Sequence, residues 1–232
     1  EKGSLGKFSS RIAMRLYEWL IDIKKDERHK NLSPEETFKL EPLLRKNNLL
    51  GSILFFEYQT DDARLTLEVI KEAVSRGAIA MNYMKVLSFI HQQGTIRGAK
   101  VIDTLSNAVF EIKAKYVVNA AGPWVEEIDN LDEKKIQLKL HLTKGVHIVV
   151  DWKKLPVKQS LYFDTFDERM IFVIPKEGKT YIGTTDTFYS GDLKNPRLTE
   201  EDRDYLLKCV NNYFPENIIA SKDIESCWAG LR

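Results

Sequence analysis

Residues 142–150 (LTKGVHIVV) place a lysine, a glycine and a histidine on one predicted strand. Because imidazole titrates near neutral pH, His147 can take up or release a proton during a reaction. A single histidine among apolar residues is more often a hydrogen-bonded structural residue, so both interpretations stay open from these residues alone. Lys144 can bind an anion or lie at a solvated strand end.

Two further groups of polar side chains lie near predicted strand ends. Residues 183–187 (GTTDT) bring together Thr184, Thr185 and Asp186, which suit either a ligand site or a hydroxyl-stabilised turn after a hairpin. Arg232 follows a segment of aromatic and small residues, 228–231 (WAGL). A guanidinium there can bind a phosphate or carboxylate through two parallel hydrogen bonds.

A run of small residues marks a different kind of site. Residues 116–118 (YVV) predict a buried strand, and Ala120, Ala121 and Gly122 then leave the backbone bare enough for a large group to lie against it. Pro123 suits the first position of a helix. A strand that turns into a helix start can hold a cofactor or an anion, and a plain packing corner explains the composition equally well.

Composition excludes several function classes. The 232 residues suffice for one or two domains, and a net charge of +1 gives no general reason to expect nucleic-acid binding. The two cysteines form no CxxC or Cys/His cluster, which argues against structural zinc and a disulfide framework. No Walker A loop, GxSxG, HExxH or GxGxxG occurs, so we do not expect a self-contained nucleotide-binding enzyme.

The elements that must position these residues alternate between helices and strands. Residues 8–23 predict a helix with one wide apolar face beside basic residues, which suits packing on neighbours or contact with an anionic membrane surface. No apolar run approaches the ~20 residues of a membrane span. Ser33 and Thr199 each predict a capped helix start. We predict a third helix from Asp61 and Asp62 to Gly77, and the expected strands cover residues 52–58, 78–90, 110–112, 141–151, 160–163, 169–175 and 180–184, with turns at 93–94, 97–98 and 176–179.

Taken in order, six segments resemble one family. They are residues 61–65 (DDARL), 117–124 (VVNAAGPW), 144–149 (KGVHIV), 173–175 (VIP), 183–187 (GTTDT) and 228–232 (WAGLR). Together they resemble the FAD-dependent glycerol-3-phosphate dehydrogenases, within the larger group of amino-acid-oxidase-like flavoproteins. Ala121 departs from the family, which often has Thr there. The family's N-terminal strand–GxGxxG–helix has no counterpart in the sequence.

The resemblance implies an α/β to α+β fold in which part of an FAD-binding α/β domain is interleaved with a largely antiparallel β-sheet substrate (cap) domain. The expected divisions are a helical segment with the first cap strand (1–59), a partial FAD-binding domain (60–130), the cap (131–228) and the start of a return to the FAD domain (229–232). The expectation is a fragment of the enzyme that lacks the N-terminal GxGxxG region and the C-terminal part. We expect that fragment to be inactive on its own.

The implied reaction oxidises sn-glycerol 3-phosphate to dihydroxyacetone phosphate by hydride transfer to FAD, with the electrons passing on to a quinone. By resemblance, His147 assists the proton transfer, and Arg232 binds substrate oxygens. Lys144, Thr184, Thr185 and Asp186 are the other expected substrate-side residues. The expected FAD contacts are Val86, Ala120, Ala121, Gly122 and Trp124, and no metal is expected.

Two alternatives follow from the same sequence. One is a glycerol-3-phosphate oxidase, or a related amine or amino-acid oxidase, that uses oxygen. Another is a non-enzymatic module that binds a membrane surface or a partner through residues 8–23. The dehydrogenase hypothesis itself implies a cytoplasmic protein peripheral to the inner face of the cell membrane, and it leaves a homodimer open.

Overall fold

The computed structural model describes residues 7–20, 24, 27–132 and 139–232, and the chain divides into two compact units. The first unit combines Glu1–Glu57 with Leu142–Arg232, and the second is Tyr58–His141. Every strand pair among the described residues is antiparallel. The mixture of helices and antiparallel sheets confirms the predicted fold class.

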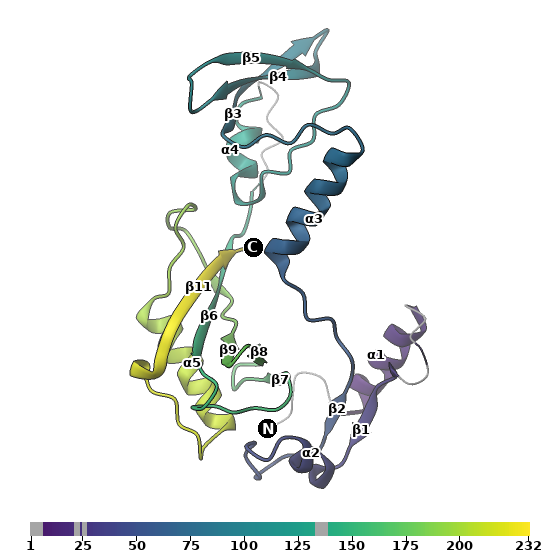
Figure 1. Cartoon of the computed structure of the whole chain (residues 1–232), viewed down its shortest axis with the longest axis vertical. Coiled ribbons are helices and arrows are strands. Elements are labelled where there is room, and N and C mark those ends of the chain that lie inside the picture. The colour runs from purple at the N-terminus through teal and green to yellow at the C-terminus, as the bar shows by residue number, and fades with distance from the viewer. Residues whose placement is uncertain (1–6, 21–23, 25–26, 133–138) are drawn as a thin grey trace. The chain divides into compact units, whose positions relative to one another are not determined.

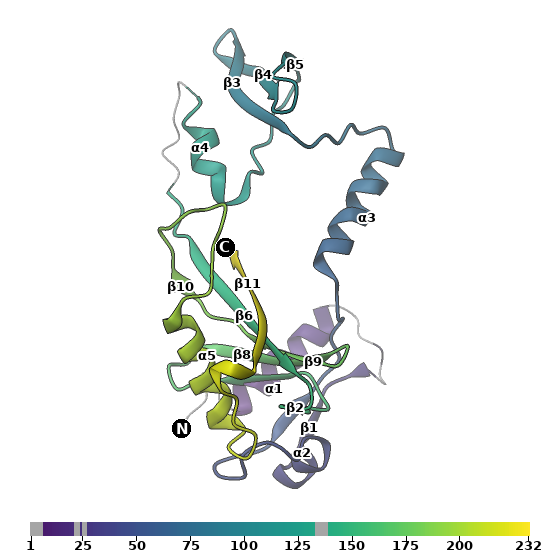
Figure 2. The same ribbon diagram turned by 60° about the vertical axis from the view of Figure 1, so that its left-hand side comes forward.

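The first unit is built on a six-stranded sheet in the order β10-β6-β9-β8-β7, with β11 also paired to β6 (Figure 1). Its strands are β6 (Thr143–Asp151), β7 (Leu161–Asp164), β8 (Met170–Lys176), β9 (Lys179–Gly183), β10 (Thr187–Phe188) and β11 (Ile224–Leu231). The predicted hairpin at residues 176–179 is confirmed, because Lys176 pairs with Lys179. Both views show β6 and β11 running side by side (Figures 1 and 2).

Helix α5 (Glu200–Tyr213) covers one face of this sheet. Its apolar residues Leu206 and Val210 are fully buried in one cluster with Ile148, Val150 and Ile182 of the sheet. The predicted cap at Thr199 is confirmed, because its side chain accepts a hydrogen bond from the Asp202 amide. The turn η3 (Ser221–Asp223) then leads into β11. This packing leaves the opposite face of the sheet free of α5.

The N-terminal part of the first unit contains α1 (Lys7–Leu20), β1 (Lys30–Leu32), α2 (Pro34–Leu40) and β2 (Ser52–Leu54). The capping box of Ser33 and Glu36 starts α2 as predicted. The helix predicted over residues 8–23 is confirmed as far as Leu20, and residues 21–23 lie outside the described residues. The strand predicted over residues 52–58 ends at Leu54, because β1 pairs with only three of its residues.

The second unit contains α3 (Asp62–Ser75), β3 (Met84–Gln92), β4 (Thr95–Asp103), β5 (Val109–Lys113), η2 (Gly122–Trp124) and α4 (Val125–Asp129). Asp61 caps α3 as predicted. The strand expected from residue 78 begins only at Met84. The turn predicted at residues 97–98 is wrong, since both residues lie inside β4. Gly98 is required there because a Cβ would collide with the Ile112 carbonyl oxygen of the neighbouring β5.

The structure also corrects the strand expected at residues 116–118 of the second unit. Residues 116–118 form no strand, and the side chains of Tyr116 and Val118 are 86% and 84% exposed. No strand among the described residues pairs with them, so β propensity alone does not order this segment. The helical turn that follows Gly122 and Pro123 is confirmed.

No helix in the described part of the chain is long and apolar enough to cross a membrane. The same residues contain no cluster of three or more His, Cys, Asp or Glu side chains that would suit a metal ion.

Candidate active site

The open face of the large sheet carries a row of directly paired residues from five strands. Trp228 pairs with His147, His147 with Gly183, Gly183 with Phe172, and Phe172 with Tyr162. Directly paired residues of antiparallel strands project to the same face, so these five share one surface, called here the transverse row. Trp228, Phe172 and Tyr162 are 45%, 39% and 48% exposed. The row therefore presents an imidazole among accessible aromatic rings.

The His147 ring has a defined position in this row. It stacks on the indole of Trp228, with ring centroids 4.8 Å apart and an interplanar angle of 10°. On its other side it leans over Gly183, where a Cβ would lie 2.7 Å from Cγ and 2.8 Å from Nε2 of the ring. Real Cβ atoms do not approach so closely, so the bare backbone of Gly183 is what admits the imidazole. Trp228 and Gly183 together fix the plane of the ring.

Arg232 joins His147 on the same face. Side chains alternate along a strand, so residues 228, 230 and 232 project to the same side of the chain. Two backbone hydrogen bonds, of 2.8 and 2.9 Å, join Arg232 to Thr143. The guanidinium Nη2 donates to the Thr185 carbonyl at 3.3 Å and to Thr184 Oγ1 at 3.4 Å. A Cβ at Gly145 would lie 2.9 Å from Nη2, so that glycine makes room for the side chain. Arg232 as a whole is exposed, which leaves it able to meet an anionic ligand.

The electrostatics of this pair favour a neutral imidazole. Burial, and then the positive charge of Arg232, hold the pKa of His147 below its ordinary value of 6.5. Both causes penalise the charged form of the ring. At neutral pH, His147 is therefore unprotonated on one nitrogen and able to accept a proton.

The segment of residues 183–187 supports the site mainly through its backbone. Thr185 is fully buried, and its hydroxyl accepts from the Val146 amide at 3.0 Å and donates to the Lys144 carbonyl at 3.2 Å. Thr184 is half-buried and its hydroxyl donates to the Thr185 carbonyl at 3.0 Å. Asp186 is exposed, and its carbonyl oxygen accepts from Arg169 at 3.2 Å. The Gly183–Thr184 peptide bond is cis.

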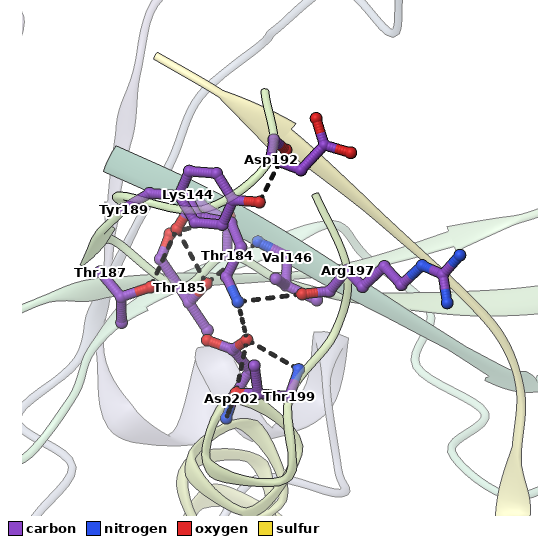
Figure 3. Close-up of polar contacts among 10 residues, drawn as sticks. All are labelled: Lys144, Val146, Thr184, Thr185, Thr187, Tyr189, Asp192, Arg197, Thr199 and Asp202. Carbon is purple, nitrogen blue, oxygen red and sulfur yellow. Dashed lines mark hydrogen bonds and ion pairs between the residues drawn. The ribbon is translucent and has the colours of Figure 1, made fainter. Parts of the chain in front are cut away.

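Lys144, which was expected to bind an anion or substrate or to lie at a solvated strand end, has its side chain on the face of β6 opposite His147. The two residues are three apart on β6, and strand alternation sends their side chains to opposite faces. The Lys144 side chain lies on the α5 side and is 6% exposed, and its ammonium contacts Asp202 at 2.5 Å (Figure 3). A cation that is buried and paired in this way is not directed at a ligand on the His147 face.

The residues expected to contact FAD lie in the second unit, apart in the chain from His147 and Arg232. Val86 is on β3, where it pairs with Val101. At Gly122 the φ angle is +54°, and no atom lies within 4 Å of the position that a Cβ would occupy. Ala120 and Gly122 are exposed, and Ala121 and Trp124 are half-buried. This bare, accessible backbone fits a large flat cofactor lying against it.

The turn at these small residues is held by a side chain that sequence reasoning left out. Asn119 Nδ2 donates to the Val125 carbonyl at 3.0 Å, and Asn119 Oδ1 accepts from the Ala121 amide at 3.3 Å. The Asn side chain thus braces both ends of the turn without covering its backbone. An Asn two residues before a Gly-containing turn was the signal available in the sequence.

Sequence reasoning also missed residues on both sides of the large sheet. Gly183, Phe172 and Tyr162 complete the transverse row, and Asp202 pairs with Lys144 beneath it. The strand register that aligns the row is not visible in the sequence. The sequence indicates a capping role for Asp202, because it is the third residue of a capped helix. It does not indicate the contact with Lys144.

The sequence of this chain is similar to those of known proteins. The sequence profile of the FAD dependent oxidoreductase family (DAO) matches residues 7–232. The chain is 49% identical over 230 residues to an aerobic glycerol-3-phosphate dehydrogenase of Bacillus subtilis (strain 168), covering 99% of this chain and 41% of that protein. It is 50% identical over 232 residues to the protein of the same name in Staphylococcus aureus (strain USA300), with 99% of this chain and 42% of that protein covered.

A solved structure agrees with these relatives. The glycerol-3-phosphate dehydrogenase from Bacillus halodurans complexed with FAD superposes with a TM-score of 0.81 and is 56% identical, covering 87% of this chain and 41% of that one. The chain thus spans about two fifths of the length of these three proteins. The profile match over nearly all of its residues shows that the chain belongs to the FAD dependent oxidoreductase family.

Proposed function

We propose that this chain supplies the substrate-binding face and part of the FAD site of an enzyme that oxidises sn-glycerol 3-phosphate to dihydroxyacetone phosphate. The observation that carries the proposal is a neutral His147 held beside an exposed Arg232 on the open face of the sheet. Relatives with about half of their aligned residues identical carry the name glycerol-3-phosphate dehydrogenase, which supports this substrate over others in the family.

In this proposal the oxidation removes a proton from the C2 hydroxyl of the substrate and a hydride from C2 itself. His147 takes the proton of the C2 hydroxyl, which its lowered pKa leaves it free to accept. Arg232 binds substrate oxygens and stabilises the negative charge that develops on the C2 oxygen as that proton leaves. FAD, when bound, supplies the acceptor for the C2 hydride. The C2–O bond becomes a carbonyl, so electrons and protons balance.

Other residues of the site then act by orientation. Trp228 and Gly183 hold the imidazole plane, and Thr184 and Thr185 hold the guanidinium. The proposed FAD contacts are Ala120, Ala121, Gly122, Trp124 and Val86. Of the three small residues, Ala120 and Gly122 are exposed and Ala121 is half-buried. Asp186 is accessible beside this segment, and we propose it only as a neighbour of the substrate.

The test is flavin reduction in the FAD-loaded enzyme. We expect His147→Gln to slow reduction by glycerol 3-phosphate by roughly 10²-fold, the usual effect of losing a proton acceptor, while FAD content stays at the wild-type level. His91→Gln is the matched control, because His91 is paired with Asp132 in the second unit. An unchanged reduction rate in the His147 variant would remove His147 from the chemistry.

We further propose that the electrons pass to a quinone rather than to oxygen. The relatives' shared name, dehydrogenase rather than oxidase, supports this choice. Anaerobic turnover with a soluble quinone analogue should exceed peroxide production in air by at least an order of magnitude. Stoichiometric peroxide would instead make the protein a glycerol-3-phosphate oxidase.

A peripheral place at the inner face of the cell membrane is proposed from α1. Its residues Leu16, Trp19 and Leu20 are 55%, 77% and 66% exposed, on one side of the helix beside the exposed Arg15. Exposed apolar and basic side chains on one helix are typical of interfacial helices. Trp19→Asp should reduce co-sedimentation with anionic liposomes several-fold, whereas Ile79→Asp, at an 87% exposed apolar residue of the second unit, should not. Equal binding by both variants would exclude α1 as the contact.

A further inference from the structure

Lys144 and Asp202 form an ion pair beneath the candidate active site. Their side chains are 6% and 3% exposed, and Nζ lies 2.5 Å from Oδ2 (Figure 3). Removing two charges from water is unfavourable unless further hydrogen bonds satisfy them. A pair buried this deeply therefore needs a network, and the question is what that network holds in place.

The network on the Asp202 side joins the start of α5 to the preceding loop. Asp202 Oδ2 accepts from the Thr199 amide at 3.0 Å and from the Thr199 hydroxyl at 2.9 Å. The Lys144 ammonium also donates to the Arg197 carbonyl at 2.9 Å. Burial acts to raise the pKa of Asp202, but the hydrogen bonds from Lys144 and Thr199 outweigh it and leave that pKa below its ordinary value. Asp202 is thus ionised at neutral pH.

The network on the Lys144 side leads directly to the open face. The Lys144 carbonyl accepts from the hydroxyls of Thr185 at 3.2 Å and Thr187 at 3.4 Å. Figure 3 shows both threonines directed at that carbonyl, with the ammonium of the same residue directed at Asp202. The Thr185 carbonyl in turn accepts from Arg232. Four residues, Asp202, Lys144, Thr185 and Arg232, therefore form a continuous path through the sheet.

We propose that Asp202 is a positioning residue for Arg232: through Lys144 and Thr185 it fixes the carbonyl on which the guanidinium rests. This inference rests on the proposed function, in which Arg232 binds the oxygens of the substrate. It extends that function by giving Lys144 and the first turn of α5 a role in the site. A purely structural pair would stabilise the fold without setting the place of the Arg232 charge.

The test uses Asp202→Asn in the FAD-loaded enzyme. We expect kcat/KM for glycerol 3-phosphate to fall about tenfold, with FAD content unchanged, because small misplacements of a positioned group are costly. We also expect the pKa of His147, followed by NMR of labelled histidine, to rise. Burial and the charge of Arg232 both lower the pKa of His147. The pKa of His147 therefore reports whether the guanidinium stays in place. The neighbouring rings on that face are those of Tyr181 and Trp228, and the Trp228 indole has no titratable group.

Three controls separate positioning from stability. Asp204→Asn removes a 67% exposed carboxylate from the same helix and should leave both readouts unchanged. Leu207→Ala on α5 should lower Tm without moving the pKa of His147. Asp202→Glu keeps a carboxylate at the third helical position, where Glu commonly completes a capping box, and should recover at least half of the lost kcat/KM.

The outcomes are distinct. A lower Tm with wild-type kcat/KM and an unmoved pKa of His147 would show that the pair is only structural and overturn the proposal. If Asp202→Asn does not fold, Thr185→Val cuts the same path at another residue and must shift both readouts in the same direction, or the proposal fails. If the wild-type enzyme is not reduced by glycerol 3-phosphate, the proposed function fails, whereas the His147 titration still tests the positioning because it needs no substrate.

Discussion

The imidazole of His147 occupies the space that a side chain at position 183 would need. We expect Gly183→Ala to displace the ring, because its Cβ would lie 2.7 Å from Cγ of His147. Under the proposed function, flavin reduction by glycerol 3-phosphate should slow by an order of magnitude or more, since proton transfer requires hydrogen-bond reach. Stopped-flow absorbance of the flavin measures this rate.

Gly230 provides a matched control for this substitution. It lies on the neighbouring strand between Trp228 and Arg232, and nothing lies within 4 Å of the position of its Cβ. Gly230→Ala should therefore reduce flavin at close to the wild-type rate. Equal rates in all three proteins would mean that the ring position is not important for the reaction.

The protonation of His147 gives a second prediction for a single residue. Burial is the first cause of its lowered pKa and the charge of Arg232 is the second, so Arg232→Gln should raise that pKa only part of the way towards 6.5. Because the folded-state pKa lies below the unfolded one, protonation favours the unfolded state, and His147 weakens stability as pH falls below about 6.5. Histidine NMR across pH 4–8 measures the shift. A lower pKa in the variant would contradict the assignment of the Arg232 charge as a cause.

Helix α5 holds the sheet from the side opposite the site, so its core residues should control stability rather than chemistry. Leu206 is fully buried against the sheet, and Leu206→Ala should cost about 2–5 kcal/mol of unfolding free energy by leaving a cavity. Asp204→Ala, at an exposed position of the same helix, should cost less than about 0.5 kcal/mol. Urea denaturation followed by circular dichroism compares the two. Equal losses would mean that α5 is not packed as described.

Local chemistry explains which elements were predictable from the sequence. Ser33, Asp61 and Thr199 cap their helices as expected, because a capping side chain acts within three residues of itself. The segment at Tyr116 was not predictable in this way, because a strand needs a partner and none of the described strands supplies one. Gly98 signalled a turn but serves close contact between β4 and β5, two uses of glycine that composition cannot separate.

In the candidate site, too, the residues marked by a local motif were predictable and the contacts between distant residues were not. His147 and Arg232 were identified by their motifs, and the structure brings them to one face by alternation along β6 and β11. Alternation also places Lys144 and His147 on opposite faces of β6, because their spacing along the strand is odd. Asp202 is 58 residues from Lys144, and no local pattern in the chain indicates a contact at that separation.

At the scale of the whole molecule, the first unit is assembled from two separate stretches of chain. Hydrogen bonds join them, from the Arg45 amide to the Tyr213 carbonyl at 2.8 Å and from the Lys158 amide to Glu41 Oε2 at 2.7 Å. Leu43 and Leu44 add apolar contact with the core under α5. These contacts imply that the N-terminal stretch is held by packing as well as by its covalent connection.

A cleavage experiment tests this assembly. Tyr58 is 91% exposed and lies outside any strand or helix, so a protease recognition sequence inserted after it should be cut without unfolding the chain. The two pieces, residues 1–58 and 59–232, should co-elute on gel filtration and separate only in denaturant.

Combining Glu41→Ala with Arg45→Ala removes contacts to Lys158, Gln159 and Asn212, and should release the smaller piece under native conditions. If the unsubstituted pieces separate at once, the N-terminal stretch is not an integral part of the first unit. If the doubly substituted pieces stay together as firmly as the unsubstituted ones, the apolar contacts of Leu43 and Leu44 suffice and the polar contacts are dispensable.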